Sequence, residues 1–185
     1  MKSFAVAVIA LVSFTTFAQT TKKVNTTKSK VEWVGKKVTG QHSGTISLAE
    51  GALVFKGKKL AGGTFTVDMT SINTTDLQGE MKGKLDGHLK SDDFFGVEKF
   101  PTANLEFKTI TSKGNDVYTV NADLTIKGKT NPISFDMKVN GSTATTKLMV
   151  DRAKYDIRYG SGSFFDNLGD KTIYDEFELD VTLNF

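Results

Sequence analysis

The last nine residues of the chain, FELDVTLNF at positions 177–185, alternate strictly between apolar and polar side chains. The apolar set comprises Phe177, Leu179, Val181, Leu183 and Phe185. Successive side chains of a β-strand point to opposite faces, so a period of two places these five on one face and the polar residues on the other. The segment therefore predicts a strand with one face in a core and one in water.

The same alternation recurs in segments 64–69, 118–126 and 133–139. Short glycine-containing turns such as Lys127-Gly128 and Asn140-Gly141 separate the alternating segments. Half-buried strands joined by tight turns predict an antiparallel sheet. About eight strands is the number at which such a sheet closes into a small barrel. We therefore predict an all-β fold, an eight-stranded antiparallel barrel, with a two-sheet sandwich as the alternative.

One segment, from about Gln78 to Leu89, has helical spacing instead. Its apolar residues are four positions apart, and Thr75-x-x-Gln78 fits a capping box at its start. A second stripe consists of Gly79, Gly83 and Gly87. Each interior glycine costs a helix about 1 kcal/mol relative to alanine, so we expect a weak helix that depends on docking. The glycines either let this short helix lie close against the barrel or make it a loose lid segment.

The N-terminus has the features of a bacterial export signal. Lys2 precedes an apolar stretch over residues 4–17, and small residues flank Phe17 in Thr16-Phe17-Ala18. The stretch is shorter than the roughly 20 residues that span a bilayer. We predict a signal peptide over residues 1–18, a polar lead-in over 19–28 and the barrel domain over 29–185, in a periplasmic or secreted protein without stable membrane insertion.

Composition narrows the class of protein further. The chain has no cysteine, so neither a disulfide framework nor a lipid-modified cysteine is possible. The formal charge of +3 is a small surplus without arginine-lysine clusters, which argues against nucleic acid as a partner. The oligomeric state stays open, a homodimer included.

No set of side chains predicts catalysis, a metal site or a cofactor. The two histidines are His42, in a glycine-flanked turn, and His88, on the polar shoulder of the helix, and both favour structural roles. Asp92 and Asp93 are adjacent and point apart, which favours a cap before a short turn over an acid–base pair. Segment 166–170 lacks the ligand pattern of a calcium loop. We expect no enzyme, although an unrecognised acid–base site and a solid-cored structural envelope protein remain alternatives.

Aromatic residues are abundant, with fourteen phenylalanines. Most fit strand interiors, but five lie outside the alternating segments: Phe94, Phe95, Phe100, Phe164 and Phe165. They either plug the ends of the barrel or line an entrance.

Arg152 shares the strand parity of Leu148 and Val150, so a continued strand would point it inward. An inward charge in an apolar barrel needs a partner. That partner is either an internal carboxylate or the polar head of a ligand, such as a phosphate.

Several segments together resemble the signatures of the YceI-like family. They are LKSDDFF at 89–95, EKFPTA at 98–103, LTIKGKTNPI at 124–133 and DRAKYDI at 151–157. The order and spacing agree over roughly 29–185, which is more specific than any single motif. Many members carry a histidine within the segment corresponding to 33–37, where this chain has lysines, and a glycine at Asp156.

The resemblance implies a lipocalin-like barrel, export to the periplasm and binding of a polyisoprenoid or similar amphiphilic lipid inside the barrel, without an established catalytic activity. A long lipid of this kind implies an elongated apolar cavity. The expected ligand contacts are Trp33, Phe65, Phe94, Phe95, Phe100, Phe107, Leu124, Phe135, Leu148, Arg152, Tyr155, Phe164, Phe165 and Phe177.

Overall fold

The computed structural model describes residues 18–185, so the predicted signal peptide, apart from Ala18, lies outside the described residues. The elements of the described part are, in chain order, β1 (Gln19–Lys23), β2 (Lys30–Lys37), β3 (Gly40–Lys56), β4 (Lys59–Thr74), α1 (Gly79–Lys90), β5 (Thr102–Gly114), β6 (Val117–Ile126), β7 (Lys129–Asn140), β8 (Thr143–Asp151), the 3-10 helices η1 (Arg152–Tyr155) and η2 (Gly169–Lys171), and β9 (Ile173–Asn184).

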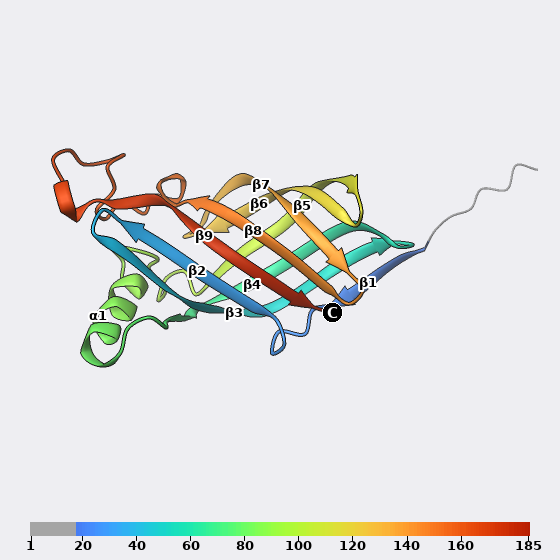
Figure 1. Ribbon diagram of the computed structural model, residues 1–185, viewed down its shortest axis with the longest axis horizontal. Helices are drawn as coiled ribbons and strands as arrows, with labels where there is room; N and C mark the ends of the chain where they lie inside the picture. Colours follow the sequence, from blue (N-terminus) through green and yellow to red (C-terminus); the bar gives the residue numbers. More distant parts are fainter. Residues whose placement is uncertain (1–17) are drawn as a thin grey trace, which may run out of the picture.

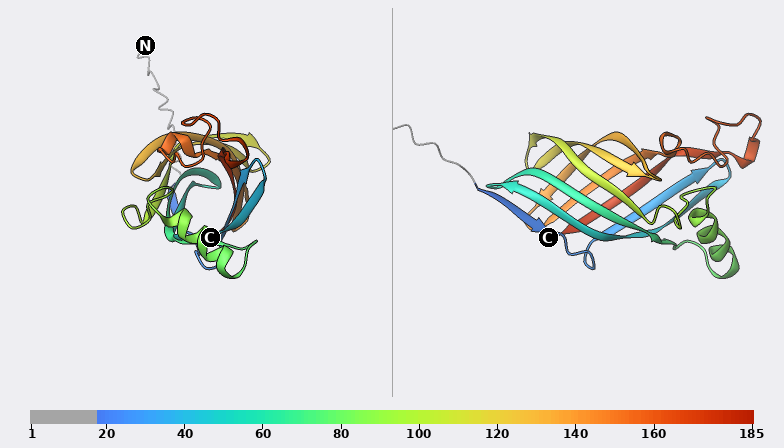
Figure 2. Two further views of the ribbon diagram at one scale, coloured as in Figure 1. Left: turned by 90° about the vertical axis from the view of Figure 1, so that its left-hand side faces the viewer. Right: turned by 180° about the vertical axis from the view of Figure 1, so that it is seen from behind.

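Strands β2 to β9 form a closed antiparallel barrel, with α1 at one end (Figure 1, Figure 2). The strand order is β1-β3-β2-β9-β8-β7-β6-β5-β4, and pairing of β4 with β3 closes the ring. The prediction of an eight-stranded antiparallel barrel with one short helix is confirmed. The alternating segments become strands because one face of each is turned into the barrel.

Strand β1 was not predicted, and it lies within the stretch expected to be a polar lead-in. It pairs with the edge of β3, from Gln19 opposite Lys56 to Lys23 opposite Ala52. All five of its residues are exposed, so backbone hydrogen bonds rather than an apolar face hold it. A strand of this kind has no alternation in its sequence, which is why the pattern did not reveal it.

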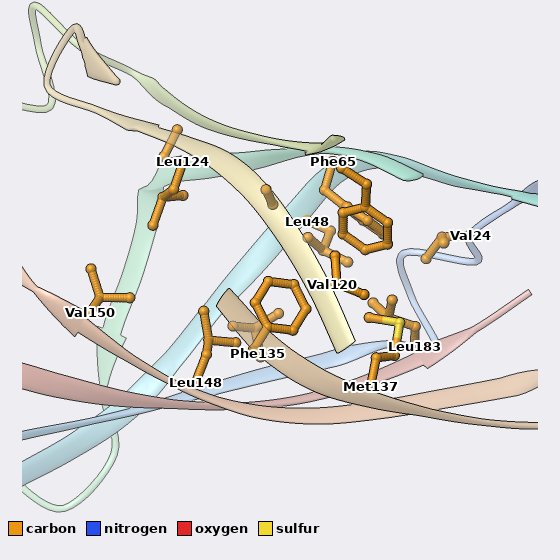
Figure 3. Close-up of a cluster of buried hydrophobic side chains, with 14 of the residues drawn as sticks. Val24, Leu48, Phe65, Val120, Leu124, Phe135, Met137, Leu148, Val150 and Leu183 are labelled. Atoms are coloured by element: carbon orange, nitrogen blue, oxygen red, sulfur yellow. The ribbon is translucent and has the colours of Figure 1, made fainter. Parts of the chain in front are cut away.

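Buried apolar side chains pack together inside the barrel (Figure 3). The ring of Phe107 lies between those of Phe65 and Phe135, with centroid distances of 5.5 and 5.9 Å. Val120 and Met137 are fully buried beside them. These side chains fill the half of the barrel that is farther from α1.

Helix α1 begins within one residue of the prediction, but the predicted capping box is wrong. Gln78 is the N-cap residue and makes no side-chain hydrogen bond there. The backbone N–H and the hydroxyl of Thr75 both donate to the carbonyl oxygen of Ser43, at 3.0 and 3.4 Å. Thr75 thus continues the pairing of β4 with β3, and this contact keeps it from capping the helix.

The helix is weakly attached to the barrel. None of residues 79–90 is buried. Its main polar anchor is Asp86, which accepts a hydrogen bond from the backbone N–H of Thr74 at 2.8 Å and forms an ion pair with Lys82. Burial raises the pKa of Asp86, but the hydrogen bonds from Lys82 and Thr74 outweigh it, so the pKa lies below its usual value.

The glycine stripe does not serve close packing. A Cβ atom added at Gly83 or Gly87 would meet no other atom of the described chain within 4 Å. The interpretation that these glycines bring the helix close to the barrel is therefore wrong. Their remaining effect is the intrinsic weakness that they give to α1.

Candidate functional site

An apolar cavity of about 140 Å³ lies in the half of the barrel nearer to α1. Among the described residues that line it, Arg152 is the only charged one, and the rest are apolar or aromatic apart from Gly35. The lining residues are Val31, Trp33, Gly35, Ile46, Val67, Met69, Ile72, Leu89, Phe94, Phe95, Ala103, Leu124, Ile126, Arg152, Ile173, Tyr174, Phe177 and Leu179. An apolar cavity with few polar groups is the usual form of a site for an apolar ligand.

Six of the predicted contact residues meet at this cavity: Trp33, Phe94, Phe95, Leu124, Arg152 and Phe177. Trp33 uses its indole N–H internally, donating to the carbonyl oxygen of Thr45 at 3.3 Å, so its ring is left for apolar contact. The ring lies against Gly44, where an added Cβ would be 2.5 Å from it. Glycine at position 44 therefore makes room for this wall of the cavity.

The other predicted contact residues lie elsewhere. Phe65, Phe107 and Phe135 belong to the packed half of the interior, and Leu148 and Tyr155 are buried away from the cavity lining. Because these aromatic rings occupy the interior, the cavity is shorter than the predicted elongated one. The remaining three are Phe100, which lies against Gly128, and Phe164 and Phe165, which are exposed.

Several lining residues are absent from the prediction, among them Val67, Met69, Leu89, Ala103 and Tyr174. Strand parity marks Met69 and Ala103 as inward-facing, but parity does not say how far along the barrel axis a residue lies. Nearness to α1 is the missing information, and it comes only from the three-dimensional register of the strands.

Phe94 and Phe95 reach the cavity from the turn that follows α1. The backbone N–H of Phe95 donates to the carbonyl of Leu89 at 3.1 Å, and Lys127 Nζ donates to the carbonyl of Phe94 at 2.8 Å. Ser91 caps the C-terminal end of α1, its hydroxyl donating to the carbonyl of His88 at 2.7 Å. Asp92 pairs with Lys99 at 2.5 Å, so it serves this turn, as the interpretation of a cap before a turn predicted.

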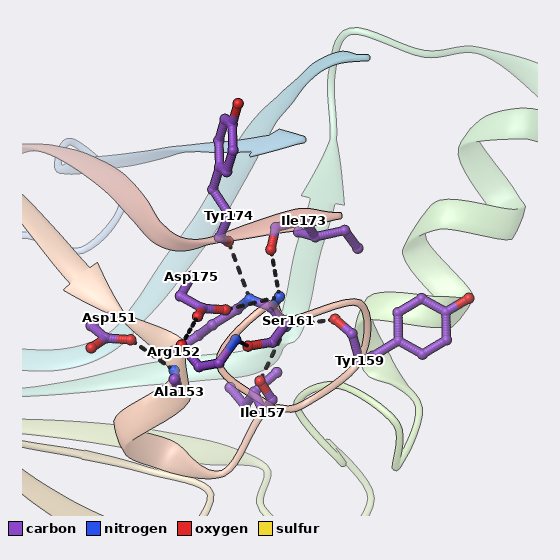
Figure 4. Close-up of polar contacts among 10 residues, drawn as sticks. Asp151, Arg152, Ala153, Ile157, Tyr159, Ser161, Ile173, Tyr174 and Asp175 are labelled. Carbon is purple, nitrogen blue, oxygen red and sulfur yellow. Dashed lines mark hydrogen bonds and ion pairs between the residues drawn. The ribbon is translucent and has the colours of Figure 1, made fainter. Parts of the chain in front are cut away.

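Arg152 is 2% exposed and its guanidinium is surrounded by internal oxygens (Figure 4). Nε donates to Tyr174 O at 3.2 Å, Nη1 to Ile157 O at 3.1 Å and Tyr159 O at 2.8 Å, and Nη2 to Ile173 O at 2.9 Å. Nη2 also lies 3.2 Å from Asp175 Oδ1. Burial lowers the pKa of Arg152, an effect that Asp175 and Asp151 oppose.

This arrangement supports the internal-partner interpretation of Arg152. Every nitrogen of the guanidinium already faces an oxygen of the protein. The group therefore fixes the position of the chain that follows η1. Strand β8 ends at Asp151 rather than continuing, because the Asp151 carboxylate accepts a hydrogen bond from the N–H of Ala153 at 3.0 Å and starts η1. The arginine is thus turned inward by a helical turn and not by strand parity.

Two neighbours of Arg152 complete this turn. Asp156 has a left-handed backbone with φ of 61°, a conformation that glycine adopts more readily than other residues. Tyr155 is buried, and this burial raises its pKa to about 12. Both residues support the turn rather than the cavity.

The structure places one histidine differently from the prediction. His42 lies in strand β3 rather than in a turn, and its Nδ1 is 2.9 Å from Asp76 Oδ2. Burial raises the pKa of Asp76, but its bonds with His42 and Ser43 lower the pKa below the usual value. His88 lies in α1, and its ring packs against those of Phe94 and Tyr159, with centroid distances of 5.7 and 4.3 Å. Within residues 18–185 no three metal-ligating side chains are grouped as they would be around a metal ion.

A larger hollow, about 740 Å³, lies on the outer surface across β3 to β7. Its lining includes a row of polar side chains on adjacent strands, formed by Glu50, Thr66, Asn104, Thr125 and Thr130. Thr66 and Thr125 hydrogen-bond to neighbours within this row. These polar groups satisfy one another on the barrel wall, so we take the inner apolar cavity as the candidate site.

The closed barrel agrees with comparisons to known proteins. A model of the YceI-like domain matches residues 23–185. The chain belongs to the YceI-like family. In the described part of this YceI-like protein, no helix is long and apolar enough to cross a membrane.

Curated relatives match over part of their length. A UPF0312 protein of Staphylococcus aureus strain N315 is 42% identical over 78 residues, which is 42% of this chain and 39% of that protein. A UPF0312 protein of Shewanella denitrificans is 31% identical over 91 residues, 49% of this chain and 46% of that protein. The matched regions thus span less than half of the length of these relatives.

Solved structures share the barrel. Burkholderia cenocepacia BcnA aligns with a TM-score of 0.64 and 25% identity, over 86% of this chain and 98% of that one. A polyisoprenoid binding domain from Saccharophagus degradans, implicated in plant cell wall breakdown, aligns with a TM-score of 0.58 and 14% identity, over 87% of this chain and 95% of that one. At 14% identity the second likeness concerns the fold.

Replacing Arg152 tests its internal role. Arg152→Ala leaves buried carbonyl groups and Asp175 without their partner, and Arg152→Lys cannot reach carbonyls on several sides with one ammonium group. We expect each variant to lower the free energy of unfolding by about 3 kcal/mol or more, measured by urea denaturation. The exposed Arg158→Lys is the matched control and should change it by less than about 0.5 kcal/mol. An Arg152→Ala protein as stable as the parent would contradict the assignment.

Proposed function

We propose that the protein binds an isoprenoid or similar amphiphilic lipid inside the barrel and carries or stores it, without catalysing a reaction. The observation that supports this most directly is the apolar cavity of a closed barrel, which has aromatic side chains around its mouth. Burying each methylene group in such a site contributes about 0.8 kcal/mol, so a hydrocarbon chain binds there without many polar contacts.

The chemistry of the lining also suggests how the lipid is oriented. Arg152, the one charged residue of the lining, is committed to internal oxygens and does not offer a free N–H to a headgroup. We therefore place the hydrocarbon tail in the cavity and the polar head at the mouth. That a structural neighbour from Saccharophagus degradans is a polyisoprenoid binding domain adds support for the class of lipid.

The size of the cavity implies that binding involves movement. An apolar cavity of about 150 Å³ is large enough for benzene, so 140 Å³ accommodates one short piece of a chain. A longer isoprenoid requires the cavity to widen. Helix α1 is the element that can yield most easily, because none of its residues is buried and it has interior glycines. On this proposal, α1 moves outward as the chain enters, and its residue Leu89, which lines the cavity, moves with it.

A structural envelope protein with a solid core is the second candidate. The aromatic cluster of Phe65, Phe107 and Phe135, which fills the other half of the barrel, favours it. A protein of this kind would contain no lipid, whereas a carrier should retain it through purification.

Lipid content and cavity filling separate the two candidates. Organic extraction of purified protein, read by mass spectrometry, should yield a stoichiometric lipid. Trp33, the single tryptophan, lines the cavity, so its fluorescence reports titration with prenyl alcohols, and affinity should rise with chain length. Ala103→Leu fills the cavity and should weaken binding about tenfold, the equivalent of roughly 1.4 kcal/mol.

The matched control for this experiment is Ala52→Leu, on the outer hollow, which should bind like the parent. Equal affinity for short and long prenyl chains, or an empty extract together with no response of Trp33, would favour the solid-core candidate.

The double variant Gly83→Ala/Gly87→Ala tests the movement of α1. Each substitution stabilises the helix by about 1 kcal/mol and meets no neighbour within 4 Å. We expect slower uptake of a prenyl alcohol in stopped-flow fluorescence and greater protection of residues 79–90 from hydrogen exchange. Gly162→Ala, also in open space, is the control and should leave the rate unchanged. If α1 in the parent exchanges as slowly as β9, with or without lipid, helix movement is the wrong explanation.

We also propose that the protein works in the periplasm or outside the cell. The sequence features of residues 1–18 support this, and cleavage after Ala18 would start the mature chain at Gln19. Intact-mass analysis of the periplasmic and secreted fractions should find that chain. Ala18→Tyr removes the small residue at the cleavage site, so the precursor should accumulate. Detection of the parent with Met1 intact in the membrane fraction would argue against export.

A further inference from the structure

Large apolar side chains that are exposed gather at one end of the molecule. Among residues 18–185 they are Val38, Met81, Met149, Tyr159, Phe164, Phe165 and Tyr174. Six of these seven belong to the turn between β2 and β3, to α1, to the segment that leads into β9, or to the start of β9, all at the α1 end of the barrel (Figure 1, Figure 2). Met149 alone lies on the barrel wall, in β8. We call the six residues other than Met149 the mouth rim.

The segments that carry the mouth rim contact one another. The backbone N–H of Val38 donates to the carbonyl of Thr172 at 3.1 Å, which joins the β2–β3 turn to the segment before β9. Across the mouth, the ring of Tyr159 lies 4.3 Å from that of His88 in α1. The segments that carry the exposed apolar residues therefore adjoin one another at this end of the barrel.

Segment 156–172 holds its aromatic residues outward on an anchored backbone. Arg152 binds the carbonyls of Ile157 and Tyr159, and Ser161 is fully buried. The hydroxyl of Ser163 donates to Asp175 at 2.6 Å. Immediately afterwards come Phe164 and Phe165, which are 38% and 50% exposed. Since the flanking chain is fixed, their exposure is a feature of the fold that carries a cost in water.

The mouth rim is continuous with the cavity. Tyr174 lines the cavity and is also 51% exposed. The far half of the barrel is filled by the cluster around Phe107, so a chain that enters the cavity passes the rim. Aromatic rings, and tyrosine with its polar hydroxyl in particular, suit the boundary between water and hydrocarbon.

Charges around the rim nearly cancel. Lys36 and Lys37 lie at the end of β2, and segment 156–172 carries three aspartates, Asp156, Asp166 and Asp170, against Arg158 and Lys171. A strongly anionic surface therefore has no special attraction here, whereas an electrically neutral one fits.

We propose that the mouth rim docks on the surface of a neutral phospholipid bilayer, so that lipid passes directly between the membrane and the cavity. The proposal rests on the proposed function, since it names the surface from which the bound lipid comes. Phe164 and Phe165 are the side chains expected to insert.

Co-sedimentation with phosphatidylcholine vesicles tests docking. The parent should bind the vesicles. The fraction bound should change little between about 0.1 and 1 M salt, because salt screens charges but not apolar contacts. Phe164→Ser/Phe165→Ser should lower the partition at least tenfold. The matched control is Met149→Ser, which removes an exposed apolar side chain outside the rim and should bind like the parent. Unchanged melting of both variants shows that the fold is kept.

A site-specific probe locates the contact. Because the chain has no cysteine, Phe165→Cys and Met149→Cys each carry a single thiol for an environment-sensitive dye. Vesicles should raise and blue-shift the emission at position 165 and leave position 149 unchanged. Equal responses at the two positions, binding lost in high salt, or a dimer that forms through the rim and is abolished by Phe164→Ser/Phe165→Ser would overturn the proposal.

Lipid extraction of the same proteins separates this proposal from the proposed function. If the parent contains lipid but does not bind vesicles, the proposed docking surface is wrong and the proposal of lipid binding stands. A parent that binds vesicles through the rim but neither contains lipid nor binds prenyl alcohols would make the lipid-carrier function wrong and leave the docking surface intact.

Discussion

Closure of the sheet through strand β3 is the constraint on which the rest of the structure depends. β3 pairs with β2 and β1 along one edge and with β4 along the other, and its register with β4 shifts at three places. Irregularities of this kind bend a strand and increase its twist, which helps a sheet of eight strands to close. Once the sheet is closed, every inward-facing side chain belongs to one interior, and that interior can be filled or left hollow.

The interior is divided between these two states. Phe65, Phe107 and Phe135 fill one half, whereas the half near α1 keeps an apolar cavity. An unfilled cavity lowers stability, and the packed half offsets that cost. Arg152 stabilises the boundary at the mouth, where its guanidinium binds the backbone of both the segment after η1 and the start of β9. Barrel closure, aromatic packing and the buried guanidinium of Arg152 together keep an open cavity compatible with a stable fold.

The strands of the barrel could be predicted because apolar and polar residues alternate along them with a period of two. Features that depend on contacts without such a pattern could not. β1 is held by its backbone alone, and Thr75 binds Ser43 instead of capping α1. Strand parity identifies the residues that face inward but not their position along the barrel axis. Phe65 and Phe177 are therefore equivalent by parity, although only Phe177 lines the cavity. Whether Phe164 fills an end or faces water depended on the anchoring of its segment, which no local pattern reveals.

The two sides of the mouth differ in rigidity, and this difference suits a carrier that exchanges lipid with a membrane. The segment bearing Phe164 and Phe165 is fixed through Arg152, whereas α1 opposite has no buried residue. A fixed side can hold the protein against a bilayer while a weak side opens. Bilayer and cavity are both apolar, so moving a hydrocarbon chain between them changes its free energy little, and the main barrier is exposure to water on the way. Docking of the rim would remove that exposure, which gives a physical reason for the fold to maintain aromatic side chains in water around the mouth.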